Sequence, residues 1–226
     1  PVTAASWWLK LGLTGAAFLG ALGGVLLTLL LAQGVQHTLR LLLAGVVVGY
    51  VLGAVKDLVT LSAPDVLSSM LAFVLGNTSL LGWAACGVLA LVLVPLLVVS
   101  AATARVLDGL SLGEATAFSL GLPLAPMRAL LVAVLALGTG AAVAQAGLIG
   151  FVGLAAPHLV RGMVRVTHGP LLLLSAITGG LLLSVADIVA RVLIAPQELP
   201  VGVLTAVLGG TYLLWLMYRR TRGGRG

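Results

Sequence analysis

The chain has 226 residues, of which 61% are hydrophobic and only 8% are charged, and its mean hydropathy is +1.23. A soluble domain carries about 25% charged residues, and a core of this size cannot bury so much apolar surface. The composition therefore excludes an ordinary soluble domain. The net charge of +6 is better explained by orientation in a membrane than by nucleic-acid binding.

Apolar runs near the length that a bilayer requires, roughly 20 residues for a helix, recur along the whole chain. They lack the period-two alternation of barrel strands and exceed the length of such strands. The predicted fold is an all-α polytopic transmembrane bundle, a single membrane domain over residues 1–226. Its seven predicted spans are 11–32, 40–62, 79–102, 129–148, 150–166, 170–193 and 202–218.

Basic residues are distributed unevenly over the gaps between these runs. Nine of the twelve lie in alternate gaps and in the tail at 219–226, whereas Lys10, Lys56 and Arg191 lie in the other gaps. The positive-inside rule makes the richer side cytoplasmic, so we expect a cytoplasmic C-terminus. Seven spans then put the N-terminus outside. No signal peptide is evident, and the simplest explanation is that leading helices are missing from this chain.

Two features are expected near the outer face. Segment 63–78 is amphipathic and too short to span, so it predicts a short helix there, with Pro64 in its first turn. Asp187 and Arg191 are four residues apart, share one helical face, and are expected to form a structural ion pair.

The gap at 104–128 is the most informative cytoplasmic segment. Ser111 and Glu114 have the spacing of a capping box, which predicts a short helix ending near Gly121, with Pro123 as a stop. Two interpretations remain open at this point. The helix lies on the membrane surface, or it docks a cytoplasmic partner.

Several function classes are disfavoured by missing residues. The chain has no GxxxxGK[ST] phosphate loop, no His, Cys or carboxylate cluster with metal-ligand spacing, and no nucleophile–base constellation. We therefore predict a non-enzymatic protein without a cofactor of its own. A retinal protein needs a lysine in its last helix, and the only lysines are Lys10 and Lys56. An ion-driven secondary transporter is kept as an alternative, although Asp57 and Asp187 both lie toward an outer end.

The C-terminal half carries a distinctive motif. Residues 147–158 read GLIGFVGLAAPH, and Arg161, Asp187, Arg191 and the run ELPVG at 198–202 follow. This pattern resembles the permeases of iron–siderophore and vitamin B12 ABC importers (FecCD type). The segment at 110–121 is similar to the cytoplasmic coupling loop of that family. The motif residues that carry the resemblance are Gly150, Phe151, Gly153, Pro157, His158 and Arg161.

The resemblance implies a permease subunit of an ABC importer for iron chelates (siderophore, or else haem or cobalamin) in the bacterial cell membrane. Its implied partners are a second permease copy, identical or closely related, two cytoplasmic ATPase subunits that hold ATP and Mg²⁺, and an extracytoplasmic substrate-binding protein. Family members usually have ten spanning helices, and this chain matches the last seven. A truncated, inactive permease is therefore a further alternative.

The resemblance also assigns roles to residues. It makes 103–128 the coupling loop, so that Glu114→Pro is expected to uncouple the ATPase. The expected ATPase contacts are Ser111, Leu112, Gly113, Glu114, Thr116, Ser119, Leu120 and Gly121. The expected outer-gate or binding-protein contacts are Pro64, Asp65, Pro196, Glu198 and Pro200.

Overall fold

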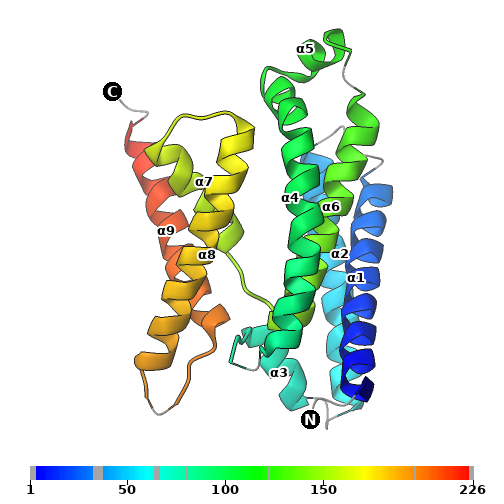
Figure 1. Cartoon of the computed structure of the whole chain (residues 1–226), viewed down its shortest axis with the longest axis vertical. Coiled ribbons are helices and arrows are strands. Elements are labelled where there is room, and N and C mark those ends of the chain that lie inside the picture. The colour runs from blue at the N-terminus through cyan, green and yellow to red at the C-terminus, as the bar shows by residue number, and fades with distance from the viewer. Residues whose placement is uncertain are drawn as a thin grey trace. The chain divides into compact units, whose positions relative to one another are not determined.

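The computed structural model describes residues 4–32, 38–63, 67–79, 81–121, 123–195 and 197–223. These residues form helices joined by short links, and no strand occurs among them, which confirms the all-α prediction (Figure 1). The helices are α1 (Ala4–Leu31), α2 (Thr38–Ser62), α3 (Leu67–Leu75), α4 (Trp83–Ser111), α5 (Glu114–Ser119), α6 (Leu124–Ala146), α7 (Val152–Met163), α8 (His168–Val192) and α9 (Val201–Gly223).

Six of the seven predicted runs form helices of 23 to 29 residues. Among the described residues, the spans in α2, α4, α6 and α8 are both long and apolar enough to cross a membrane. The run at 150–166 differs. Its helix α7 has 12 residues, about 18 Å of helix, and so does not cross a bilayer by itself. It begins after Phe151, which has a positive φ, and ends at Val164 in extended backbone.

The outer surfaces of the long helices are apolar. On α8, for example, Leu181 and Ile188 are 63% and 62% exposed, whereas the buried positions of the same helix include Ala186 and Ala190. Small residues face the helix contacts and large apolar residues face outward, which is the arrangement expected when lipid is the solvent. The chain is therefore a multi-pass membrane protein.

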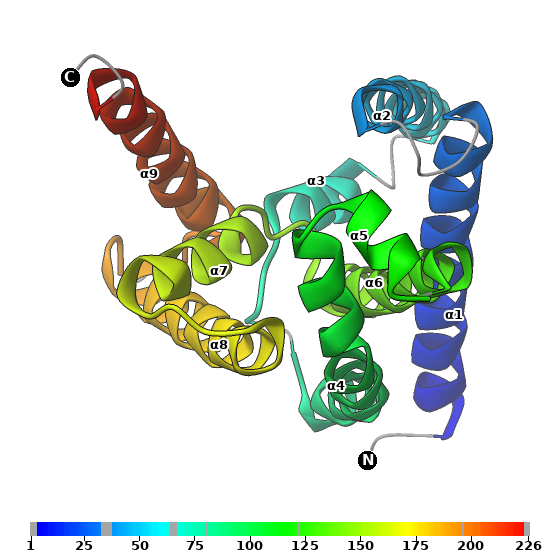
Figure 2. The ribbon, with the colours of Figure 1, turned by 90° about the horizontal axis from the view of Figure 1, so that it is seen from above.

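The chain divides into two compact units. The first contains Pro1–Leu71, Leu81–Val99 and Gly109–Gln145, and α1 packs against α2 within it (Figure 2). Its helices approach at glycines. A Cβ built on Gly24 would lie 3.6 Å from Leu52, and one on Gly45 would lie 3.8 Å from Thr28. These are ordinary contact distances, so the glycines let the two helices pack closely.

The second unit contains Ala72–Leu80, Ser100–Asp108 and Ala146–Gly226. Within it, α7 packs against α8 and α9, and α8 packs against α9 (Figure 2). A Cβ on Gly179 of α8 would lie 3.6 Å from Ala156 and from Val152 of α7. The polar clusters described below all lie in this unit.

Candidate functional site

The segment between α4 and α6 forms a short helix, but this helix begins differently from the prediction. α5 starts at Glu114 directly after Gly113, whose φ of 106° favours glycine. Ser111 is the last residue of α4. The predicted capping box is therefore wrong, because it requires Ser111 at the N-cap and Glu114 three residues into the helix. The side chain of Glu114 lies outside the described part of the chain.

The end of α5 agrees better with the prediction. The helix stops at Ser119, and Gly121 follows with a φ of 74°. Thr116 and Ser119 are exposed, and the Ser119 hydroxyl donates to the Thr116 carbonyl at 2.8 Å. Pro123 follows α5 and directly precedes α6, and its carbonyl accepts a bond from Met127 N at 3.2 Å. Most of the predicted loop 103–128 is therefore helical.

Large apolar side chains are exposed in residues 111–121, which we call the α5 segment. Phe118 is 75% exposed, Leu112 is 67% and Leu120 is 62%, whereas Ala117 is fully buried at 0%. Exposed apolar side chains on a short connecting helix are compatible with both interpretations, a helix on the membrane surface and a helix that docks a partner. The predicted contact segment contains all three residues, although only Leu112 and Leu120 were singled out in it. The only signal of Phe118 in the sequence was a single aromatic residue among small and polar neighbours.

A polar contact between Asp108 and His168 joins the last turns of α4 to the start of α8. The Asp108 carboxylate accepts the main-chain N–H of His168 at 2.9 Å and lies 2.6 Å from His168 Nδ1. Asp108 thus caps the N-terminus of α8, where a negative charge also interacts favourably with the helix dipole. The sequence prediction singled out neither residue. The two residues are 60 positions apart, so local patterns carried no signal of this pair.

The opposite end of α8 carries a cluster that we call the Asp187 cluster, consisting of Thr78, Ser79, Asp187, Arg191 and Glu198. Arg191 Nε lies 2.9 Å from Asp187 Oδ2, so the predicted pair forms. Arg191 Nη1 also lies 3.6 Å from Glu198 Oε1. The hydroxyls of Thr78 and Ser79 donate to Asp187 and Glu198, respectively. The cluster therefore ties α8 to the links before α4 and before α9.

The predicted outer contacts are only partly visible. Pro64, Asp65 and Pro196 lie outside the described residues. Glu198 is exposed and belongs to the Asp187 cluster, and Pro200 is half-buried just before α9. Near them, Leu199 N donates to the carbonyl of Ala190 at 3.2 Å, which holds this link against the end of α8.

Three segments cross at glycines next to the Asp187 cluster. Gly76 and Gly147 have φ values of 66° and 72°, and Leu148 N donates to the carbonyl of Phe73 at 2.9 Å. Gly202 N donates to the carbonyl of Gly76 at 3.2 Å. A Cβ on Gly202 would lie 2.6 Å from the Leu148 carbonyl oxygen, far inside contact distance. Because main chain meets main chain, these crossings fix the links that carry Thr78 and Glu198.

The family-type motif of residues 150–161 surrounds the start of α7. Phe151 is its N-cap with a φ of 67°, an uncommon conformation for a residue with a side chain. A Cβ on Gly209 of α9 would lie 2.8 Å from Phe151 Cγ, so glycine is needed there for close approach. Gly150 and Gly153 are exposed, and Pro157 lies within α7. Arg161 lies in the last turn of α7 and is exposed.

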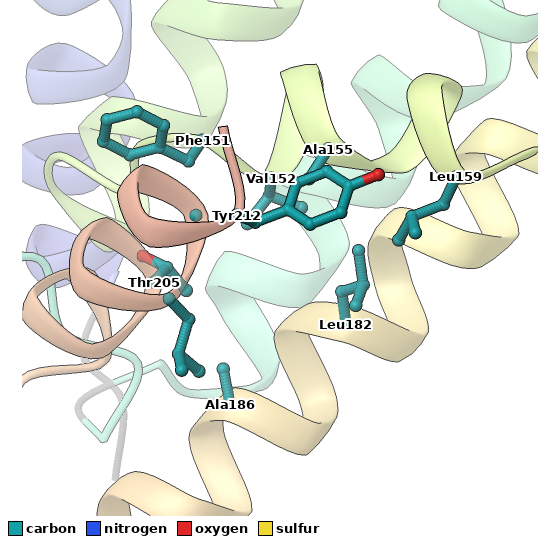
Figure 3. Close-up of a pocket in the computed structure, with 10 residues that line it drawn as sticks. Phe151, Val152, Ala155, Leu159, Leu182, Ala186, Thr205 and Tyr212 are labelled. Atoms are coloured by element: carbon teal, nitrogen blue, oxygen red, sulfur yellow. The ribbon is translucent and has the colours of Figure 1, made fainter. Parts of the chain in front are cut away.

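Phe151 and helices α7, α8 and α9 line a partly open pocket of about 220 Å³ (Figure 3). Its lining is apolar apart from Thr205 and Tyr212. The Thr205 hydroxyl donates to the Gly202 carbonyl at 3.0 Å, so it is already satisfied. The ring of Tyr212 meets His158 edge-on, with centroids 6.0 Å apart. The pocket therefore offers shape and apolar surface rather than reacting groups.

The described residues contain no group of three or more His, Cys, Asp or Glu side chains that could hold a metal ion. Their polar groups cap helices, pair with one another and join helices to links. Such an arrangement can position and move helices.

The comparisons with known proteins agree with this architecture. The model of the FecCD transport family matches residues 2–219. The chain therefore belongs to the FecCD transport family, which confirms the resemblance seen in the motif.

Three curated relatives are similar over 90% of this chain. They are the Fe(3+) dicitrate transport system permease protein FecD of Escherichia coli (38% identical), the vitamin B12 import system permease protein BtuC of Vibrio cholerae (39%) and the hemin transport system permease protein HmuU of Yersinia pestis (37%). The chain spans 64%, 62% and 62% of their respective lengths, which is less than two thirds.

A solved structure described as an inward-facing conformation of a metal-chelate type ABC transporter is also similar. It matches with a TM-score of 0.80 and 27% sequence identity, over 93% of this chain and 72% of that one.

Proposed function

We propose that the chain is a transmembrane permease of an ABC importer for iron chelates. It would couple ATP hydrolysis on a partner subunit to import. The names of the relatives support this substrate class, because iron dicitrate, hemin and vitamin B12 are all metal chelates. A siderophore is the first cargo to test, followed by haem and cobalamin.

The proposed assembly contains two permease copies, two cytoplasmic ATPase subunits and an extracytoplasmic binding protein in the bacterial cell membrane. The proposed cytoplasmic side is the end where α8 begins and α9 ends. Charge supports this orientation. Arg105, Arg161 and Arg165 are exposed toward the start of α8, and the arginines of 219–226 follow or end α9. In the Asp187 cluster, by contrast, the two carboxylates of Asp187 and Glu198 outnumber the one arginine, so the opposite end of α8 carries no excess of positive charge there.

The observation that carries the proposal is the exposed apolar surface of the α5 segment in a member of this family. We propose that this segment contacts the ATPase through Leu112, Phe118 and Leu120. The other predicted contacts, which are Ser111, Gly113, Glu114, Thr116, Ser119 and Gly121, shape or border that surface. The two glycines with positive φ, Gly113 and Gly121, would hold the helix at a set angle to its neighbours.

On the other side of the membrane we propose that Glu198 and Pro200 contribute to the outer gate and to the binding-protein contact. The Asp187–Arg191 pair would keep a structural role, because it links α8 to Thr78 and Glu198 rather than standing free.

The structure improves the test of coupling. Glu114 is the first residue of α5, where proline is tolerated, so Glu114→Pro is a poor disruptor. Ala117 is buried, and its N–H donates to the Gly113 carbonyl at 3.0 Å. Ala117→Pro removes this bond and is expected to abolish stimulation of the ATPase while membrane insertion is retained. Glu114→Pro serves as the matched control and is expected to have the smaller effect.

The assay measures ATP hydrolysis and chelate uptake in proteoliposomes that contain the full-length permease with its ATPase and binding protein. Unchanged substrate-stimulated hydrolysis in Ala117→Pro would refute the role of the α5 segment. Absence of chelate uptake by the wild-type assembly would refute the import function itself.

A further inference from the structure

α8 is held at its first residue by the helix that leads into the α5 segment. The Asp108 carboxylate takes both the main-chain N–H and the Nδ1 of His168, and a bond to a charged acceptor is stronger than one between neutral groups. Packing supports these bonds, since a Cβ on Gly169 would lie 3.8 Å from Ala104 Cβ. The end of α4 and the start of α8 therefore form one contact.

Only a short link separates Asp108 from α5. α4 continues for three residues beyond Asp108, and Leu112 and Gly113 then connect it to Glu114. Both linking residues are held by bonds of 3.1 Å, from Leu112 N to the Gly109 carbonyl and from Gly113 N to the Leu110 carbonyl. The chain between Asp108 and α5 therefore contains no long loop.

The far end of α8 is tied just as directly. Asp187 accepts from Thr78 and pairs with Arg191, and Arg191 in turn approaches Glu198. His168 and Asp187 lie on the same unbroken helix, roughly 28 Å apart along its axis at 1.5 Å per residue. α8 thus contacts Ala104 and Asp108 of α4 at one end and two links between helices at the other.

From this arrangement we propose, building on the proposed function, that α8 transmits movement of the α5 segment to the links at 76–79 and 197–200. Asp108 acts as the positioning residue that connects the α5 segment to α8. Docking or release of the ATPase shifts α5, Asp108 carries the shift to His168, and the Asp187 cluster carries it to Thr78 and Glu198. A purely structural cap at His168 would stabilise α8 but would not link its two ends.

The test is a double-mutant cycle across the length of α8. Asp108→Ala, Thr78→Val and the double variant are made in the full-length permease and reconstituted with its ATPase and binding protein. The measured quantity is hydrolysis with substrate-loaded binding protein divided by basal hydrolysis. Effects of changes more than about 10 Å apart normally add. As a control, Lys56→Gln breaks the Lys56–Asp57 pair within α2 and is combined with Asp108→Ala.

Each single change at the ends of α8 is expected to lower the stimulation ratio about fivefold or more, the lower range of allosteric coupling. The stimulation ratio of the double variant is expected to be no lower than that of the single variant with the lower ratio. The effect of Lys56→Gln is expected to add to that of Asp108→Ala. Additive effects of Asp108→Ala and Thr78→Val would overturn the proposal. A stimulation ratio within twofold of wild type in either single variant would also overturn it.

If Asp108→Ala cannot be purified folded, His168→Ala replaces it, because the main-chain bond to Asp108 remains available. An unchanged or additive ratio in that variant overturns the proposal equally. These outcomes are separate from failure of the proposed function, which appears as absent stimulation in the wild-type assembly.

Discussion

Truncation of Phe118 gives the most direct measure of how much the α5 segment contributes to binding of the ATPase. A phenylalanine side chain buries about 150–250 Å² when fully covered, so the 75% of Phe118 that is exposed offers roughly 150 Å² to a partner. At about 25 cal/mol per Å² this area is worth at most ~4 kcal/mol. Ordering of the side chain, incomplete burial and the area that alanine retains reduce that figure, and we expect Phe118→Ala to lose about 2 kcal/mol, or roughly 30-fold in Kd.

The assay titrates the ATPase subunit against the permease in lipid nanodiscs and compares Kd values. Leu91→Ala is the matched control, because Leu91 is 76% exposed but lies in the long apolar helix α4, where we expect lipid rather than the ATPase to contact it. It is expected to leave the affinity unchanged. A Kd for Phe118→Ala within twofold of wild type would refute the idea that this surface docks the ATPase.

Three further predictions follow from other parts of the chain. Gly202→Ala places a Cβ against the Leu148 carbonyl and is expected to cost about 1–3 kcal/mol in a thermal unfolding assay in detergent, whereas Gly210→Ala, with nothing within 4 Å, should be near neutral. Arg191→Ala removes the cation that pairs with Asp187, which keeps its bond from Thr78. Because the pair is partly exposed, we expect a smaller fall in Tm than for Gly202→Ala, and a fall as large as that of Gly202→Ala would contradict this reasoning. A fluorescent protein fused after residue 226 should fold and fluoresce in the cytoplasm, and protease accessibility of that fusion from the outer face would contradict the proposed orientation.

Much of the fold could be read from the sequence because the relevant signals are local. Apolar runs of the right length become α2, α4, α6 and α8 in a bilayer whatever their neighbours are. The pairing of Asp187 with Arg191 could also be predicted, since four residues on one helix bring the two side chains together.

Other features were missed or wrong because they depend on contacts between distant segments. The predicted capping box is wrong because α4 extends to Ser111 and Gly113 is the N-cap of α5, although Ser111 and Glu114 have the spacing of the motif. Phe118 lies in the predicted contact segment but was not singled out, because exposure is a property of the folded surface. The short run at 150–166, with Gly150, Gly153 and Pro157 near its start, already indicated an irregular segment, whereas the close approach of Phe151 to Gly209 needed the structure.

The sequence by itself determined that the chain crosses a membrane as helices and belongs with the FecCD permeases, because hydropathy and a contiguous motif need no partner residues. Only the tertiary structure decided which groups meet. Asp108 reaches His168 across 60 positions, and Thr78 reaches Asp187 across 109. Such pairs depend on how helices pack, and the near-uniform apolar faces of these helices do not encode that packing in any local pattern.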